Sequence, residues 1–358
     1  MHKIALTLLP ASLLAFSPAP ANADESDPAG TKQMSAPAQA EPHMQKVLDA
    51  LASLGGKPIE TLTPEEARKQ PTPADAVKKV LTQEGKSTAP EEVGSLKHMS
   101  IPGPGGDIPI HIYSPKGKGP FPVMVYYHGG GWVIADTMTY DASPRALANG
   151  AKAIIVAVDY RQAPEHPFPA ASDDAYAAYQ WVLSHAREFQ ADPHRVAVGG
   201  ESAGGNLATV VSMMARDKKT PMPVYELLVY PITNNDFSTP SYLENATAKP
   251  LSKPMMEWFF KQYAPDAKEA NNPYVSPLKA ESLRGLPPAT IITDEIDPLR
   301  SEGKAYADRL RSAGVKVSYK NYVGVTHEFF GMGAVVPKAK EAEQKASADL
   351  RNAFSAKR

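Results

Sequence analysis

Ser202 is the residue of this chain best placed to act as a nucleophile. It lies in the centre of GESAG, residues 200–204, between an apolar run at residues 195–199 and a helix-like stretch at residues 206–216. A strand that turns at once into a helix needs glycines, because a Cβ would crowd the turn. Such a turn projects one hydroxyl above the sheet edge and directs helix N–H groups toward developing negative charge. The pattern alone also fits a glycine-rich connection with a solvated serine, so its partners decide the interpretation.

A second glycine cluster follows another apolar run in the segment VMVYYHGGGW, residues 123–132. Consecutive glycines let the backbone approach a ligand and turn its N–H groups inward, as an oxyanion hole requires. We predict that Gly130, Gly131 and Ala203 supply these donors, with Gly129 as an alternative. A phosphate-binding loop is disfavoured, because neither G-K-[ST] nor G-x-G-x-x-G is formed. We expect His128 to hold the loop in place rather than act as a base.

An acid and a base follow later in the chain. The apolar run at residues 289–293 ends in acidic residues, of which Asp297 precedes Pro298. A proline suits the first turn of a helix, so the Asp297 carboxylate is held where the chain leaves the sheet. His327 lies in a loop after the last expected strand and can reach Ser202 over the sheet edge. The order Ser202, Asp297, His327 is that of α/β hydrolases and differs from chymotrypsin-like and subtilisin-like proteases.

The segment VDYRQAPEHPFPA, residues 158–170, is a further motif, and together with those above it supports a resemblance to a known family. From about Met44 to the C-terminus the chain resembles bacterial hormone-sensitive-lipase-like esterases, also called family IV. The resemblance implies an α/β-hydrolase fold with a helical cap and an ester-hydrolysing activity. Two residues depart from the family pattern: Glu201 stands where one large branch has Asp, and Glu328 where Gly is usual. These departures affect the expected specificity and pH behaviour rather than the chemistry.

Apolar alternation and helix signals predict an α/β fold with a mostly parallel eight-stranded sheet covered by helices on both faces. The expected strands are residues 94–100, 108–113, 123–127, 153–158, 196–199, 225–230, 289–293 and 317–322. The expected core helices are residues 143–148, 172–188, 203–216, 301–312 and 338–353.

The resemblance implies that two segments outside this core form the cap. Residues 43–92 begin with an apolar stripe from Met44 to Leu54, and a second helix starts at Thr63. The α/β-hydrolase domain covers residues 93–358 and carries a cap insertion at about residues 236–272. Aromatic residues at 258–263 either line an acyl pocket or only pack the cap on the core.

The N-terminus resembles a signal peptide. A positive start precedes an apolar run, and Ala21-Asn22-Ala23 supplies a small-x-small site. We expect cleavage after Ala23, a flexible linker at residues 24–42, and export to the periplasm or medium. An uncleaved anchor or a cytosolic chain is the alternative. The chain has no cysteine, which excludes disulfides, thiolate metal sites and a lipoprotein anchor.

The predicted function is hydrolysis of short- to medium-chain carboxylic esters through an acyl-enzyme intermediate, without a metal or other cofactor. Lysine and arginine (38) balance aspartate and glutamate (39), so no bulk charge favours nucleic acid or an anionic membrane. The expected partner is a small-molecule ester, and a homodimer is left open. A lactonase or amidase on the same scaffold is the main alternative. A non-catalytic receptor of this fold is disfavoured, since all three triad residues are present.

Overall fold

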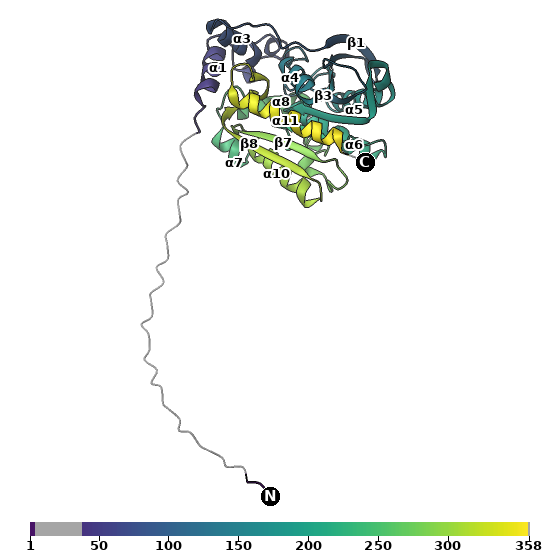
Figure 1. The fold of residues 1–358 in the computed structure, drawn as a ribbon. Coiled ribbons are helices and arrows are strands. Elements are labelled where there is room, and N and C mark those ends of the chain that lie inside the picture. Colours follow the sequence, from purple (N-terminus) through teal and green to yellow (C-terminus); the bar gives the residue numbers. More distant parts are fainter. Residues whose placement is uncertain (4–37, 357–358) are drawn as a thin grey trace, which may run out of the picture. The chain divides into compact units, whose positions relative to one another are not determined.

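A mixed eight-stranded sheet forms the centre of the protein. The computed structural model describes residues 1–3 and 38–356. Its strands run in the order β1-β2-β4-β3-β5-β6-β7-β8, and all pairs from β4 to β8 are parallel. Their bounds are β1 (Ser95–Gly103), β2 (Gly106–Ser114), β3 (Phe121–Tyr127), β4 (Ile154–Val158), β5 (Ala191–Glu201), β6 (Glu226–Val229), β7 (Ala289–Ile296) and β8 (Val317–Thr326). The predicted fold class is confirmed (Figure 1).

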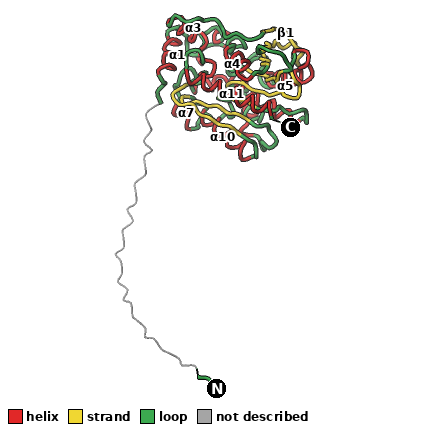
Figure 2. Tube along the Cα trace, viewed as in Figure 1, coloured by secondary structure: helices red, strands yellow, loops and turns green. Residues whose placement is uncertain are grey.

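Helices cover both faces of the sheet, and Figure 2 distinguishes them from the strands. The core helices are α4 (Ala142–Ala151), α5 (Ala170–His185), α6 (Ala203–Asp217), α10 (Arg300–Ser312) and α11 (Pro337–Ser355), with the short turns η2 (Ala186–Phe189) and η4 (Phe329–Met332). All five predicted core helices are present, each with ends within a few residues of the expected ones.

Side chains on the central strands alternate between two cores. Along β3, Val123, Val125 and Tyr127 join the core that α5, α6 and α10 complete. Met124 and Tyr126 join the core that α4 and α11 complete on the opposite face. Successive side chains of a strand point to opposite faces, so a parallel strand buried on both sides is apolar throughout. This explains why the runs preceding the glycine clusters are continuous rather than alternating in hydrophobicity.

The N-terminal segment forms three helices and one turn: α1 (Pro42–Ala52), η1 (Ile59–Thr61), α2 (Pro64–Ala67) and α3 (Pro73–Gln83). The apolar stripe and the Thr63 cap are where we predicted them, but the helix that starts after Thr63 has only four residues. It ends at Ala67, and Pro71 lies just beyond, where a proline cannot donate a helical hydrogen bond. Thr72 then caps α3 through a second capping box with Asp75.

The insertion between β6 and β7 contains no strand among the residues that the structure describes there. It forms α7 (Pro240–Glu244), α8 (Lys253–Tyr263), α9 (Ala267–Ala270) and η3 (Pro277–Lys279). The Ser252 side chain caps α8 by accepting the Met255 N–H. Met256, Phe259, Phe260 and Tyr263 make its buried face, which packs against the active-site side of the core.

The predicted signal peptide (residues 1–23) and most of the predicted linker (residues 24–42) fall on residues 4–37, outside the described residues. Cleavage after Ala23 and export therefore stay predictions. In the described part of the chain, no helix combines the length and apolar character needed to cross a bilayer.

Glu226, on β6, should make the free energy of unfolding of this protein depend on pH. Its side chain is fully buried, and burial raises its pKa to about 8, although the Ser212 hydroxyl offsets part of the effect. The folded state therefore keeps a proton that the unfolded chain loses near pH 4.5, so stability falls as the pH rises from 4.5 to 8. Glu226→Gln should remove this slope, a relative gain on the order of 2–4 kcal/mol in the free energy of unfolding by pH 8.

Denaturant unfolding at several pH values measures this difference, with Glu281→Gln as a control at an exposed position. A difference between Glu226→Gln and the parent that stays constant from pH 5 to pH 8 would contradict the prediction.

Candidate active site

Ser202 occupies a strained turn between β5 and α6. Its backbone has φ 56° and ψ −118°, a region that residues with a Cβ rarely adopt. The turn is possible because glycines on either side let two backbone segments touch. A Cβ on Gly200 or Gly204 would lie 2.4 Å or 1.9 Å from the carbonyl oxygen of Tyr127 at the end of β3. The glycines of the GESAG segment therefore allow Ser202 to lie against the neighbouring strand.

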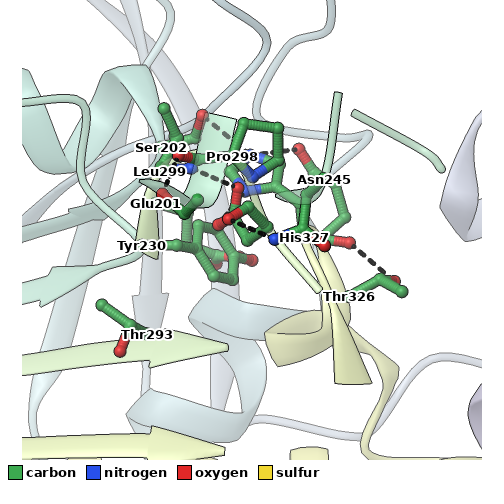
Figure 3. A network of polar contacts seen from close by, with 12 residues as sticks. Glu201, Ser202, Tyr230, Asn245, Thr293, Pro298, Leu299, Thr326 and His327 are labelled. Atoms are coloured by element: carbon green, nitrogen blue, oxygen red, sulfur yellow. Dashed lines mark hydrogen bonds and ion pairs between the residues drawn. The ribbon is translucent and has the colours of Figure 1, made fainter. Parts of the chain in front are cut away.

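The structure brings Ser202, Asp297 and His327 together. Each is the first residue after a parallel strand, namely β5, β7 and β8. His327 Nε2 lies 3.0 Å from Ser202 Oγ (Figure 3). His327 Nδ1 lies 2.9 Å from Asp297 Oδ2. A carboxylate only accepts, so Nδ1 carries the hydrogen and Nε2 is free to accept the Ser202 proton. This is the relative arrangement of a nucleophile, a general base and an orienting acid.

Of the three neighbouring acids after residue 293, only Asp297 contacts the imidazole. Its Oδ1 accepts the Leu299 N–H at 2.9 Å, which is the first amide after Pro298, so both carboxylate oxygens are held. Glu295 instead accepts the Gly324 N–H at 2.8 Å. Asp294 is fully buried, and its pKa is raised well above the usual range by burial and by the Asp297 charge. Burial and the neighbouring charge therefore both favour the protonated form of Asp294.

Opposing effects set the basicity of His327, which is almost completely buried. Burial by itself would lower its pKa, because an imidazolium is poorly solvated there. The charge and hydrogen bond of Asp297, together with the charges of Glu328 and Glu201, outweigh burial and raise the pKa above 6.5. The site therefore favours the charged imidazole that forms when a proton leaves Ser202.

The glycine loop after β3 presents free donors. Gly130 (φ 94°) and Gly131 (φ 57°) have positive φ, and both line the cavity that contains Ser202. Ala203 is the first residue of α6, where helix N–H groups lack an intrahelical acceptor. Within residues 38–356, none of these three N–H groups donates to another protein group. All three predicted oxyanion donors are therefore free, and two of them lie in the wall of the cavity.

Helix α8 of the insertion holds this loop. The Tyr263 ring stacks on Trp132 with centroids 4.2 Å apart, and Phe260 meets the same ring edge-on at 5.5 Å. Phe259 covers Gly131 so closely that a Cβ there would lie 2.3 Å from its ring. The aromatic residues thus divide between the two roles we considered: Phe260 and Tyr263 pack, and Phe259 lines the cavity.

The cavity over Ser202 has a volume of about 470 Å³. Its apolar wall comes from both segments that we predicted as cap, through Leu48, Leu51, Val77, Met255, Met256 and Phe259. Its polar lining includes Ser202, His327, Glu201 and Glu328. A largely apolar chamber that reaches Ser202 suits a substrate with a short apolar chain.

Glu201 and Glu328, the two departures from the family pattern, each bind tyrosine hydroxyls. Glu201 accepts from Tyr126 at 2.6 Å and from Tyr230 at 2.5 Å, and the Tyr230 ring lies 4.5 Å from the His327 ring. Burial raises the pKa of Glu201 to about 7 despite these bonds. Glu328 accepts from Tyr140 at 2.6 Å. The sequence drew attention to these two acids because they depart from the family pattern. Nothing in the sequence indicated that tyrosines would bind them.

His128 has the structural role that we predicted. It is buried, stacks on Tyr160 with centroids 4.4 Å apart, and bonds the Gly129 carbonyl. Burial lowers its pKa, so it stays neutral. Asp159, behind the loop, accepts the Thr137 N–H at 2.7 Å and faces His111 at 2.9 Å. These residues support the loop from the side away from the cavity.

One group of residues has the spacing of a cation site. Carboxylate and imidazole atoms of Asp294, Asp297 and His327 lie within 4.8 Å of one another, and all are buried. Both nitrogens of His327 are already hydrogen-bonded, so the triad accounts for this grouping. We assign no metal to it.

Comparisons with known proteins agree with this geometry. A sequence profile of the alpha/beta hydrolase fold matches residues 124–331. Carboxylesterase NlhH of Mycobacterium tuberculosis is 44% identical over 254 residues, which cover 70% of this chain and 80% of the relative. The ethyl acetate hydrolase of Pseudomonas putida is 33% identical over 288 residues, or 79% and 88% of the two chains. The crystal structure of a thermostable Pseudomonas putida esterase is 39% identical with a TM-score of 0.80, covering 89% of this chain and 99% of the other.

Gly131→Ala should damage the site through its Cβ. The new methyl group collides with the Phe259 ring, so the loop must shift. Its N–H groups then no longer point toward the expected position of the oxyanion. We expect phosphonylation of Ser202 by an organophosphate to slow by about 10²-fold, the usual cost of losing an oxyanion donor. Gly314→Ala is the matched control, because Gly314 also has a positive φ (84°) but nothing within 4 Å of a Cβ. If phosphonylation slows equally in both variants, backbone strain alone explains the effect, and the prediction is wrong.

Proposed function

The chain belongs to the hormone-sensitive-lipase-like branch of the α/β-hydrolase fold family, and from this we propose that it is a serine carboxylesterase for short- to medium-chain acyl esters. One observation carries the proposal. His327 bridges Ser202 and Asp297, with contacts of 3.0 Å and 2.9 Å, and both Ser202 and His327 line a largely apolar cavity. A nucleophile, a base and an acid so placed can perform acyl transfer without a further group.

Acylation begins when His327 Nε2 takes the Ser202 proton and Oγ attacks the ester carbonyl. The carbonyl oxygen becomes an oxyanion, which the N–H groups of Gly130, Gly131 and Ala203 stabilise. Asp297 keeps Nδ1 protonated and stabilises the imidazolium. His327 then returns the proton to the leaving alcohol, and the acyl group remains on Ser202.

Deacylation repeats these steps with water. His327 removes a proton from water, which attacks the acyl carbon, and the same three N–H groups receive the second oxyanion. Collapse of this intermediate returns the proton to Ser202 and releases the acid. Because the elbow, the loop and the imidazole are held by buried contacts, little reorganisation is needed between the two halves.

The size of the cavity supports the proposed chain length. A volume of about 470 Å³ must accept the acyl chain and the alcohol together. The wall formed by Leu48, Leu51 and Phe259 is apolar, which favours alkyl chains over polar acids. The name of the Pseudomonas putida relative, ethyl acetate hydrolase, also supports a small ester.

A panel of p-nitrophenyl esters tests the proposal. We expect kcat/KM to be highest from butyryl to octanoyl and to fall for long acyl chains, because these exceed the cavity. Ser202→Ala should lose roughly three to six orders of magnitude in kcat while folding normally. A lactone and an anilide in the same panel distinguish the alternative activities. Activity of Ser202→Ala within tenfold of the parent, or preferred hydrolysis of emulsified long-chain oil, would contradict the proposal.

Asp297→Asn should lower kcat by about 10²–10⁴-fold, because an amide no longer favours the working tautomer of His327. Asp294→Asn alters a group that does not hydrogen-bond the imidazole and whose protonated form is favoured by burial, and Glu295→Gln alters a group that binds a loop amide. Each of these should cost less than about tenfold. The measurement is kcat for the three variants, each with native circular dichroism. If Asp294→Asn or Glu295→Gln is the most damaging, the acid has been assigned wrongly.

A further inference from the structure

Glu328 adopts a backbone conformation that disfavours any side chain. It follows His327 directly and has φ 72° and ψ 3°, the left-handed region. A Cβ is disfavoured there by contact with the backbone, and glycine, which has none, is not. A strained residue beside reacting groups points to a role for its side chain.

The side chain of Glu328 faces the reacting atoms. Its Oε1 lies 3.9 Å from Nε2 of His327, the nitrogen that contacts Ser202 Oγ. The side chain is 19% exposed and lies in the wall of the cavity. Arg68, a cation in the same wall, is bound to Glu165 instead, and within residues 38–356 Glu328 forms no ion pair with lysine or arginine. Its nearest cationic partner is therefore the imidazole itself.

Tyr140 connects Glu328 to the glycine loop. Its hydroxyl donates to Glu328 Oε1 at 2.6 Å. The same hydroxyl touches the loop, since a Cβ on Gly129 would lie 2.3 Å from it. Burial raises the pKa of Tyr140 well above 10, so the hydroxyl remains a donor. One carboxylate thus contacts the base through space and the oxyanion loop through a tyrosine.

We propose that Glu328 is a positioning residue of the esterase reaction, a second carboxylate that stabilises the His327 imidazolium at Nε2 and holds the oxyanion loop through Tyr140. The triad acid acts on Nδ1, at the opposite side of the ring. When His327 takes the Ser202 proton, the positive charge lies between two carboxylates rather than beside one. The inference rests on the proposed function, because the imidazolium forms during acyl transfer.

Other ionisable groups around this pair limit the size of the effect. Asp297 lies on the Nδ1 side, the buried Asp294 lies near both residues, and Glu201 adds a further negative field from the end of β5. Tyr126 and Tyr230 are bound to Glu201 and stay protonated. Burial raises the pKa of Glu328, and the His327 charge opposes this rise. The pair is therefore most effective when the imidazole is charged, as in the tetrahedral intermediate.

Three variants separate the effect of the Glu328 charge from that of its hydrogen bond with Tyr140, which we call the bridge. Glu328→Gln removes the charge and keeps an acceptor for Tyr140. Glu328→Gly removes both and fits the left-handed backbone, so it should fold at least as well as the parent. Tyr140→Phe removes the bridge and keeps the carboxylate. Two rates are measured from pH 4.5 to 9: kcat/KM for p-nitrophenyl butyrate, and phosphonylation of Ser202 by diisopropyl fluorophosphate.

We expect both Glu328 variants to lower the midpoint of the acid limb by about 0.5–1 pH unit, because the imidazolium loses a stabilising charge. Their plateau kcat should fall about 5- to 30-fold, with KM changing less than about threefold. Tyr140→Phe should lower kcat without lowering the midpoint. A purely structural role of Glu328 would reduce the rate and leave the midpoint in place.

Acid limbs of the parent and both Glu328 variants that coincide within about 0.2 pH unit would overturn the inference. The labelling reaction separates this failure from a failure of the proposed function. If no ester is hydrolysed but labelling shows the Glu328-dependent midpoint, the proposed substrate class is wrong and the inference stands. If the parent is not labelled at all, both are wrong.

Discussion

Parallel strand pairing is the constraint on which the rest of the site depends. β5, β7 and β8 run in the same direction, so their carboxyl ends meet at one edge of the sheet. Ser202, Asp297 and His327 are the first residues beyond these ends. β3 pairs directly with β5, which places the glycine loop next to the nucleophile. As a result, the backbone of Gly204 packs directly against the Tyr127 carbonyl at the end of β3. No larger residue fits at position 204.

Around this edge the protein buries several acids, and most of them are neutralised or bound. Asp297 is held by an imidazole and an amide, Glu201 by two tyrosine hydroxyls, and Glu328 by a third. Burying a charge without partners is costly, so the raised pKa values of Asp294, Glu201 and Glu328 are the expected response. The result is a site whose negative field raises the proton affinity of a single histidine.

The cap completes the site in two ways. Helix α8 packs Tyr263 and Phe260 on Trp132, which fixes the glycine loop from above. Its Phe259, with Leu48 and Leu51 of α1, closes a largely apolar cavity that reaches Ser202. Segments far apart in the chain thus define the chamber, and its dimensions depend on how the helices pack rather than on any one motif.

Several features of this protein were readable from its sequence. The order of strands and helices follows from apolar runs and caps, and the candidate triad follows from motifs that each lie just after a strand. These signals are local, because a nucleophile elbow or a glycine loop is defined by residues within one short segment. The start of the second N-terminal helix at the Thr63 cap is a local signal of the same kind.

Only the tertiary structure decided which acids contact which groups. Tyr140 and Glu328 are 188 positions apart, and Tyr126 and Glu201 are 75 apart, so no periodicity relates them. Asp294 and Glu295 looked equivalent in the sequence, yet one is buried beside Asp297 and the other binds Gly324. Side-chain direction, burial and the local dielectric depend on elements that meet only after folding. For that reason the fold class and the candidate triad could be predicted from the sequence, while the contacts that surround the triad residues could not.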